Sequence, residues 1–311
     1  MHAAVVTHGG TDTPPEEGSG CDEAAAQALA ALSADAPADA LAAAIDAVVR
    51  LERDGRYNAG LGALPGMDGI VMELDAAIMD STGRLGAVAG IQGVRHPVRV
   101  ARCVADTPHV LLVGQGATQF ALRTGHYQPF LPNERALAQW RQYVKDMQQA
   151  QAPRAEREQA THTEDAPGRA RLKEFWNFPT PWEDAVARAG HGTVGAVARD
   201  GQGRFAVAVS TGGSPPSLFG RVADIPLVGC GYYAGEHGAV ACTGVGEHVV
   251  RRHVALRVYD MLAQGTPLRD ALAAGLRMVP AGLQIGLIGV DRRDAAVVSS
   301  QPMASAVVTG A

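Results

Sequence analysis

The residues best suited to catalysis are a glycine and the threonine that follows it at the start of a predicted strand. Gly192 and Thr193 lie in the run His191-Gly192-Thr193-Val194-Gly195. A threonine hydroxyl is a weak nucleophile, but cleavage of the Gly192–Thr193 bond would give the same residue a free α-amine with an ordinary pKa of about 7.7–8.0, able to act as its general base. Glycine supplies the backbone freedom that attack on the preceding peptide requires. These residues alone leave two interpretations open, a self-cleaving nucleophile and an ordinary strand threonine.

The sequence lacks the motifs of several other chemistries. Three glycine loops, Gly60-Leu61-Gly62, Gly114-Gln115-Gly116 and Gly244-Val245-Gly246, do not complete G-x-G-x-x-G, and no P-loop occurs, which argues against nucleotide binding. No H-E-x-x-H pattern is present, and His248 and His253 are spaced poorly for one helix face. We therefore expect surface or capping histidines. The G-x-S-x-G elbow of many serine hydrolases is also missing.

Length, charge and cysteine content narrow the class of protein. The 311 residues suit one large domain or two small ones. Lys and Arg number 27 against 32 Asp and Glu, a net charge of −5, so nucleic acid is not an expected partner. Four cysteines without a C-x-x-C pair predict buried, reduced thiols. No apolar run reaches membrane-spanning length and the first residues lack a basic signal-peptide region, so we expect a cytoplasmic protein without a membrane partner.

Apolar periodicity and turn residues predict a mixed order of helices and strands. The predicted helices are Asp22–Leu32, Ala38–Leu51, Pro97–Asp106, a long helix Glu247–Leu262, and Leu268–Met278. The predicted strands are Ala3–Thr7, Asp75–Asp80, Gly86–Gly90, His109–Val113, Thr193–Arg199, Arg204–Ser210, Val240–Cys242, Gln284–Asp291, Ala295–Ser299 and Ala304–Val308. Because strands come as hairpins and helices do not strictly alternate with them, the order favours layered α/β architecture with antiparallel sheets.

A polar segment separates two halves of the chain. Residues 149–171 contain few large apolar side chains, and we predict a mobile linker over about 149–192. Cleavage after Gly192 would then leave an N-terminal piece, 1–192, and a C-terminal piece, 193–311, which together form one structural domain.

The neighbourhood of Gly192–Thr193 strongly resembles the plant-type L-asparaginase/isoaspartyl aminopeptidase family of N-terminal nucleophile hydrolases. Many short blocks occur in the family's order, which makes the resemblance far more specific than any single glycine loop. The blocks are His8-Gly9-Gly10, Tyr57-Asn58-Ala59-Gly60-Leu61-Gly62, Glu73-Leu74-Asp75-Ala76, Gly86-Ala87-Val88-Ala89-Gly90, Gly192-Thr193-Val194-Gly195-Ala196-Val197-Ala198, Ser210-Thr211-Gly212-Gly213, Gly220-Arg221-Val222-Ala223-Asp224, Pro226-Leu227-Val228-Gly229 and Cys242-Thr243-Gly244-Val245-Gly246-Glu247.

The resemblance implies a role for each matching residue. Thr193 would be the nucleophile, and Thr211 would hydrogen-bond its hydroxyl. Thr243 and Gly244 would form the oxyanion hole, with Asn58 as a supporting donor. Substrate would be bound by the remaining matches: Arg221 on its α-carboxylate, Asp224 on its α-ammonium, and Gly246 through its backbone.

Two further expectations follow from the same resemblance. A structural sodium ion would bind backbone carbonyls of one loop, at Leu51, Glu52, Asp54, Tyr57, Ala59 and Leu61, and no other cofactor is implied. The cleaved pairs would associate as a homodimer, with the apolar helix faces between Val249 and Leu262 helping to bury the interface.

The spacing of Arg221 and Asp224 agrees with recognition of an amino acid. They are three residues apart in a glycine-flanked loop, so a guanidinium fork and a carboxylate can reach one small zwitterion. The alternative is a surface salt bridge, worth at most about 1 kcal/mol. Departures from the common pattern bear on substrate range: Ala223 where Gly is common, Pro215-Pro216 in the preceding loop Ser214–Leu218, Gln115 in place of Glu, and an unusual N-terminal loop, Thr11–Gly20.

We therefore expect the four-layer αββα sandwich of N-terminal nucleophile hydrolases. The expected activity is hydrolysis of β-aspartyl (isoaspartyl) dipeptides, and second of L-asparagine, through a β-aspartyl ester on Thr193. Two alternatives stay open. One is a glycosylasparaginase-like amidase, although such relatives typically carry Thr-Asn-Gly where this chain has Thr211-Gly212-Gly213. The other is a binding protein that is never cleaved and has no activity.

Overall fold

The computed structural model describes residues 1–33, 38–148, 192–214 and 217–310. The predicted linker lies outside the described residues, apart from its last residue, Gly192. None of the described helices is long and apolar enough to cross a membrane. All four cysteines are free thiols; three are buried and Cys103 is partly exposed, close to the expectation.

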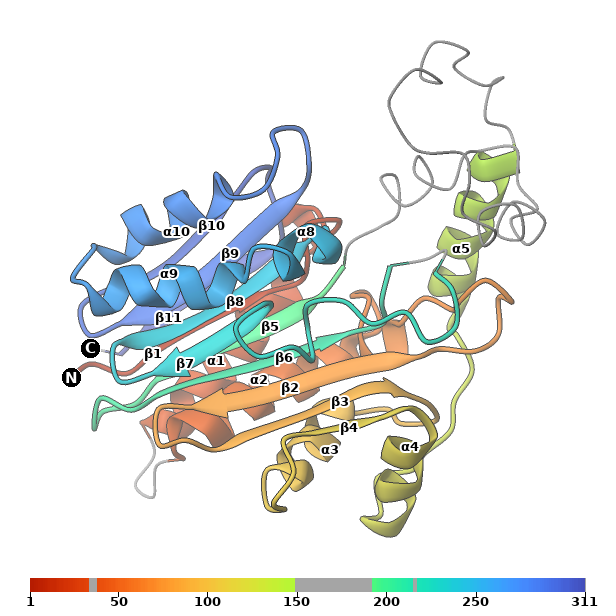
Figure 1. The fold of residues 1–311 in the computed structure, drawn as a ribbon, viewed down its shortest axis with the longest axis horizontal. Helices are drawn as coiled ribbons and strands as arrows, with labels where there is room; N and C mark the ends of the chain where they lie inside the picture. Colours follow the sequence, from red (N-terminus) through yellow and green to blue (C-terminus); the bar gives the residue numbers. More distant parts are fainter. Residues whose placement is uncertain (34–37, 149–191, 215–216, 311) are drawn as a thin grey trace, which may run out of the picture.

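Two sheets stack face to face (Figure 1). The larger has seven strands in the order β11-β1-β5-β6-β2-β3-β4 and the smaller has four in the order β10-β9-β8-β7. Their bounds are β1 Ala4–His8, β2 Leu74–Asp80, β3 Leu85–Ile91, β4 Leu111–Val113, β5 Val194–Arg199, β6 Phe205–Thr211, β7 Tyr232–Gly235, β8 Gly238–Gly244, β9 Ile285–Asp291, β10 Ala295–Ser299 and β11 Ser305–Thr309. The larger sheet therefore alternates strands that precede residue 192 in the sequence with strands that follow it.

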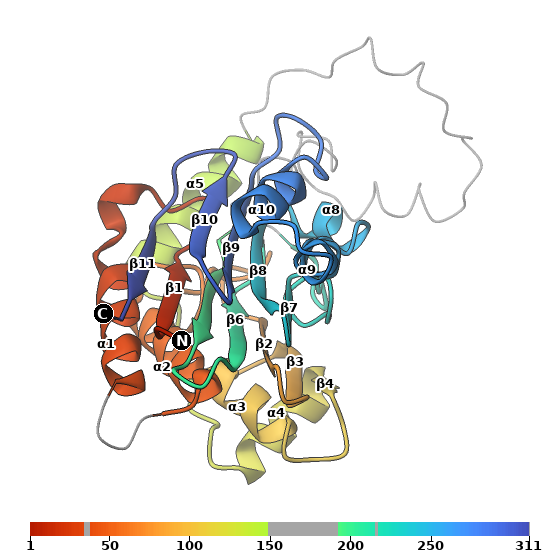
Figure 2. The ribbon, with the colours of Figure 1, turned by 90° about the vertical axis from the view of Figure 1, so that its left-hand side faces the viewer.

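Helices cover both outer faces, which makes four layers (Figure 2). One buried cluster joins α1, α2 and α3 to the large sheet, a second lies between the two sheets, and a third joins the small sheet to α9 and α10. This confirms the predicted αββα sandwich. The helices are α1 Ser19–Leu32, α2 Ala40–Asp54, α3 Pro97–Val104, α4 Gly114–Arg123, α5 Glu134–Gln148, α8 Gly246–Val250, α9 Val254–Ala263 and α10 Leu268–Leu276, with short 3₁₀ turns η1 Pro15–Glu17 and η2 Gly60–Gly62.

The central strands are buried on both faces, and the two faces differ in side-chain size. Successive residues of a strand point to opposite faces. On β5, Ala196 and Ala198 belong to the cluster beneath the helices, whereas Val197 belongs to the cluster between the sheets. On β6, Ala206 and Ala208 likewise lie on the helix side. Alanines facing an alanine-rich helix surface permit close packing of helix on sheet, which holds the start of β5 rigidly in the middle of the molecule.

One predicted helix is wrong in extent. The sequence pattern runs continuously from Glu247 to Leu262, but the structure breaks it between α8 and α9, where His253 takes a left-handed conformation with φ 48°. The first amides of α9 explain the break. Ala255 N donates to Cys230 O (3.1 Å) and Leu256 N donates to Gly229 O (2.9 Å), so the amides at this helix start are satisfied by a neighbouring loop.

Three elements were not predicted. The glycine loop at Gly114 begins α4, and β7 is too short to show a pattern. The third, α5, places Ala136, Trp140 and Met147 along one side of the helix, and its Trp140 indole donates to Gly66 O (2.9 Å), which anchors it.

Candidate active site

The sheet places Thr193 in the interior, one residue before the central strand β5. Antiparallel pairing of β5 with β6 sets Val194 opposite Ser210, so the start of β5 meets the end of β6. Thr193 and Thr211 are therefore neighbours, 6% and 4% exposed. Two threonines that are 18 positions apart in the sequence share one buried site.

A chain of hydroxyl hydrogen bonds links Thr193 to the peptide bond it would attack. The Thr193 hydroxyl donates to Thr211 Oγ1 (3.3 Å), and the Thr211 hydroxyl donates to the carbonyl oxygen of Gly192 (3.0 Å). Gly213 N also donates to Thr211 Oγ1 (3.1 Å). Thr211 thus contacts the Thr193 hydroxyl and the Gly192 carbonyl at the same time.

Asn58 supports the same carbonyl from the other half of the chain. Its side-chain amide donates to Gly213 O (2.7 Å) and, at a longer 3.4 Å, to Gly192 O. Its Oδ1 accepts from Leu64 N (3.0 Å), which fixes the orientation of the amide. Two donors, Thr211 and Asn58, therefore face the oxygen that would become negatively charged during attack.

The backbone of Gly10 packs directly against the Gly192–Thr193 bond. A Cβ built on Gly10 would lie 2.8 Å from Gly192 Cα and 2.8 Å from Thr193 N, and the residue has φ +102°. Only glycine fits this conformation and approach. His8, two residues earlier, is fully buried rather than at the surface as expected, and burial lowers its pKa to about 3, so its imidazole is neutral.

Arg221, Asp224 and Gly246 come together as the sequence predicts. A Cβ built on Gly246 would lie 2.6 Å from Asp224 Oδ1 and 3.5 Å from Arg221 Nη2. Glu247, which the sequence analysis did not single out, accepts from Arg221 Nε (3.0 Å) and Nη2 (2.9 Å). Arg221 is thereby held beside Asp224.

Asp224 is buried with one oxygen unused. Within the described residues, its Oδ2 has no hydrogen-bond partner. Burial raises the pKa of Asp224 to about 7, the nearby Arg221 guanidinium lowers it, and Glu247 raises it further. A buried carboxylate with a vacant acceptor is suited to a cationic ligand group such as an ammonium.

Asp75 is near both the threonine pair and the Arg221–Asp224 pair, and the sequence had given it no role. It is the second residue of β2, lies opposite Thr211, is 2% exposed, and accepts from Gly90 N (2.8 Å). Burial raises the pKa of Asp75 to about 7, and the charges of Arg221 and Asp224 both act on it. An Asp directly before the four apolar residues 76–79 of the strand was the available signal.

Thr243 and Gly244 close β8, immediately before the turn to Gly246. Thr243 is fully buried, and a Cβ on Gly244 would collide with the carbonyl of Gln284, so glycine is required there. Figure 1 draws the end of β8 and the start of β5 toward the same end of the sandwich. The predicted oxyanion-hole residues thus lie at the end of the molecule that holds the substrate-binding candidates.

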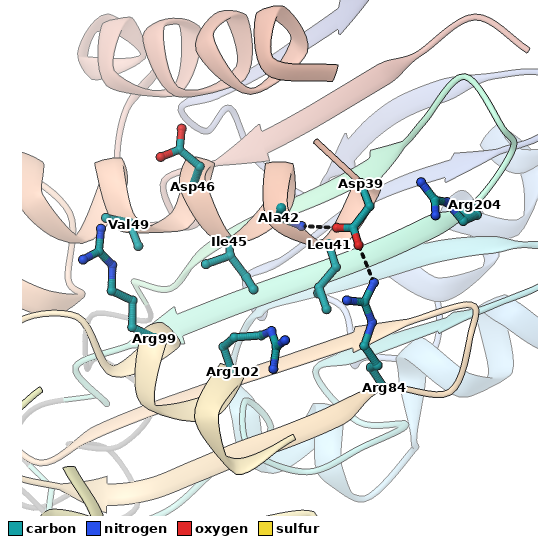
Figure 3. Close-up of a pocket in the computed structure, with 10 residues that line it drawn as sticks. All are labelled: Asp39, Leu41, Ala42, Ile45, Asp46, Val49, Arg84, Arg99, Arg102 and Arg204. Atoms are coloured by element: carbon teal, nitrogen blue, oxygen red, sulfur yellow. Dashed lines mark hydrogen bonds and ion pairs between the residues drawn. The ribbon is translucent and has the colours of Figure 1, made fainter. Parts of the chain in front are cut away.

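A separate pocket of about 680 Å³ lies away from this site (Figure 3). Asp39 and Arg84 line it and pair at 2.6 Å. Arg204, also in its wall, pairs with Asp200 at the turn after β5, the opposite end of that strand from Thr193. Its charges are largely matched within the protein, so it is not the hydrolytic site.

The loop predicted to bind sodium is a tight turn of backbone carbonyls after α2. A Cβ built on Gly60 would lie 2.6 Å from Glu52 O and 2.7 Å from Arg95 O, so two carbonyls face one point. Ala59 O accepts from Gly62 N (3.1 Å), and Leu61 O accepts from the Asn133 amide (3.2 Å). Carbonyl oxygens suit a hard cation.

The side chains of that loop are otherwise engaged. Glu52 is fully buried and bonds His96 Nδ1 and Val98 N, both at 3.1 Å. Asp54 pairs with Arg56, and the Tyr57 hydroxyl donates to Glu17 O (2.7 Å). Within the described residues, no cluster of His, Cys, Asp or Glu side chains could hold a metal ion. Any cation would therefore depend on carbonyls.

Comparison with known proteins decides the family. A family model described as Asparaginase matches residues 1–311. The chain belongs to the asparaginase family. Asparaginase-family membership agrees with the resemblance drawn from the sequence blocks and with the four-layer fold.

Individual relatives within the asparaginase family carry three different names. A plant-type L-asparaginase of Pyrobaculum calidifontis is 36% identical over 280 residues, 88% of this chain and 82% of the relative. An isoaspartyl peptidase of Salmonella typhimurium is 41% identical over 261 residues, 81% and 74% of the two chains. An N(4)-(beta-N-acetylglucosaminyl)-L-asparaginase of Elizabethkingia miricola is 31% identical over 267 residues, 80% and 68%. The chain is a hydrolase of this family.

Proposed function

We propose that this asparaginase-family hydrolase cleaves itself at Gly192–Thr193 and then hydrolyses β-aspartyl dipeptides and, second, L-asparagine. The observation that carries the proposal is the hydrogen-bond chain from the Thr193 hydroxyl through Thr211 to the Gly192 carbonyl. It sets nucleophile and carbonyl side by side, with donors already on the oxygen. A threonine that served only the sheet would need no such arrangement.

Turnover would use the same groups on an external amide. The free α-amine of Thr193 takes the hydroxyl proton, Oγ1 attacks the β-carbonyl of the substrate, and the amine or ammonia leaves with a proton. Water then hydrolyses the β-aspartyl ester and frees L-aspartate. Thr243 and Gly244 are proposed to stabilise the oxyanion. Arg221 binds the α-carboxylate and Asp224 the α-ammonium, which all these substrates share.

Mass spectrometry of purified protein, combined with a substrate panel, tests the proposal. We expect pieces ending at Gly192 and beginning at Thr193, with the highest kcat/KM on β-aspartyl dipeptides. A preference for an N-glycosylated asparagine would favour the activity in the name of the Elizabethkingia miricola relative. An intact chain without activity would support the non-enzymatic alternative.

Binding of the product L-aspartate should strengthen as pH rises through about 7. Burial raises the pKa of Asp224 to about 7, so the carboxyl is neutral below that pH and attracts an ammonium only above it. Affinity should fall about tenfold per pH unit below the pKa. Calorimetry on cleaved protein between pH 5.5 and 8 measures this.

Asp224→Asn should bind weakly with no such pH dependence, whereas Asp75→Asn, the matched control, should keep the dependence. Asp75 is the right comparison because burial also raises its pKa to about 7. An affinity that stays flat across this pH range in the unsubstituted protein would contradict the role of Asp224.

The homodimer of cleaved pairs remains a proposal, and its expected interface needs correction. Val254, Val258 and Leu262 pack in the core between α9 and the small sheet, so this apolar face is already covered within one chain. We expect light scattering at micromolar concentration to give twice the mass of one cleaved pair. The mass of a single pair across that range would count against the dimer.

Two other expectations also remain proposals. A sodium ion at the carbonyls between Leu51 and Leu61 would stabilise the turn that leads to Asn58. The cytoplasmic location rests on the sequence alone.

A further inference from the structure

The loop after β1 brings a carboxylate to the bond that is proposed to break. A Cβ built on Gly192 would lie 2.7 Å from Asp12 Oδ1 and 3.0 Å from Asp12 Oδ2. The Cβ position of Gly10 is 3.0 Å from the same Oδ1 and 2.8 Å from Thr193 N. Oδ1 and Thr193 N are thus at most about 6 Å apart, a separation that one water molecule can bridge for proton transfer.

In the part of the chain that the structure describes, one oxygen of the Asp12 carboxylate has no structural partner that explains its position. Its Oδ1 is buried and, within the described residues, lacks a hydrogen-bond partner. An unpaired buried carboxylate oxygen is costly to a fold, and such a group in a native protein calls for an explanation. Asp12 lies in the segment between β1 and η1.

We propose that Asp12 is the proton-transfer group of self-cleavage. This deepens, and rests on, the proposed function of the Gly192–Thr193 bond. The Asp12 carboxylate takes the Thr193 hydroxyl proton through one water as Oγ1 bonds to the Gly192 carbonyl carbon. It returns that proton to Thr193 N as the carbon–nitrogen bond breaks, leaving an ester between Gly192 and Thr193 Oγ1.

Hydrolysis of this ester completes the cleavage and balances the reaction. Asp12 accepts a proton from one water, whose oxygen bonds to the Gly192 carbonyl carbon, and the proton passes to Thr193 Oγ1 as the ester breaks. The overall reaction consumes one water. It produces a carboxylate on Gly192, and on Thr193 a free hydroxyl and an α-amine that takes up the proton released by the Gly192 carboxyl.

The charges around Asp12 suit this task better than those around the other nearby base. Burial raises the pKa of Asp12 to about 6, Arg135 lowers it and Glu17 raises it. Arg135 and Glu17 pair with each other at 2.6 Å, so their effects oppose. Burial lowers the pKa of His8 to about 3, which makes its imidazole a weak base. A base with a pKa near the working pH transfers protons most effectively.

The rate of cleavage in freshly synthesised protein tests the proposal. Chains made by cell-free translation are sampled over time and resolved on denaturing gels, with masses checked. Asp12→Asn should slow cleavage about 100-fold or more, the usual size of a general acid–base contribution. Asp12→Glu should recover part of the rate. Asp22→Asn, which removes the same charge from an exposed position on α1, should cleave normally.

The pH profile separates proton transfer from a merely structural role. Cleavage of the unsubstituted chain should rise between about pH 5 and 7 as Asp12 ionises, and Asp12→Asn should lose that rise. Normal cleavage in Asp12→Asn, or equal slowing in Asp22→Asn, would overturn the role of Asp12 while leaving self-cleavage intact. If Asp12→Asn misfolds, judged by its melting against the uncleaved Thr193→Ala chain, the pH profile and Asp12→Glu decide. An unsubstituted chain that never cleaves would overturn the proposed function itself.

Discussion

Thr193→Ala should leave the chain whole and reduce hydrolysis to background. The substitution removes the only atom proposed to attack either the Gly192 carbonyl or a substrate. Alanine keeps the Cβ atom at this buried position, so most of the surrounding packing is retained. Loss of a nucleophile of this kind costs on the order of 10⁴-fold or more in turnover. Mass spectrometry should find one species covering residues 1–311, and a product assay should find no release of L-aspartate.

Thr193→Ser provides the matched control. Serine keeps the hydroxyl that donates to Thr211, so this variant should still cleave and turn over, although its freer side chain is less well oriented. A Thr193→Ala chain that splits between residues 192 and 193 would show that another group, or a contaminating protease, cuts this bond.

Arg221→Ala should lower kcat/KM about 10- to 150-fold, because loss of a hydrogen bond to a charged partner costs about 1.5–3 kcal/mol. The guanidinium has five donors, of which bonds to Glu247 engage Nε and Nη2, so further donors can meet a substrate carboxylate. The loss should be similar for L-asparagine and β-Asp-Leu, since both present the same α-carboxylate. Steady-state kinetics on both substrates measures it.

Cleavage should survive Arg221→Ala better than turnover does, because the scissile bond is held covalently and needs no carboxylate partner. Arg269→Ala, at an exposed ion pair with Asp294, is the charge-matched control and should change neither. Thr211→Ala should instead lower kcat with little change in KM, since its contact is with the nucleophile. Cleaved Arg221→Ala protein with unchanged rates on both substrates would place the substrate elsewhere.

The residues around Thr193 were predictable because each belongs to a distinctive local run. Gly192, Thr211 and Asn58 sit in ordered blocks, and the strands that carry them have clear apolar patterns, so their meeting followed from the fold. Asp75 and Glu247 lie in such blocks too, but the sequence analysis assigned them no role, and Asp12 lies outside the blocks. A single carboxylate has the same appearance in a sequence whether it is solvated or buried, and only the packing around it decides.

The helices whose extent or presence the sequence pattern did not predict have a similar physical cause. The apolar period of α8 and α9 continues through the break, since the side chains on both sides face the same core. The break depends on loop carbonyls at Gly229 and Cys230 that satisfy the new helix start, a contact between distant residues. Likewise, α5 is anchored by the hydrogen bond from Trp140 to Gly66 O, a contact between residues 74 positions apart in the sequence.

The interleaved large sheet has a consequence for the cleaved protein. Strands β5 and β6, which follow residue 192, lie between β1 and β2, which precede it, and β1 is flanked on its other side by β11. After cleavage neither piece can leave without exposing the edges of several buried strands, so the two stay associated as one cooperative unit. Once fully unfolded, however, the pieces must find each other again in solution. The proposed cleavage would thus turn a unimolecular, reversible folding reaction into a bimolecular one whose recovery depends on protein concentration, and the cleaved form would owe its persistence to slow unfolding.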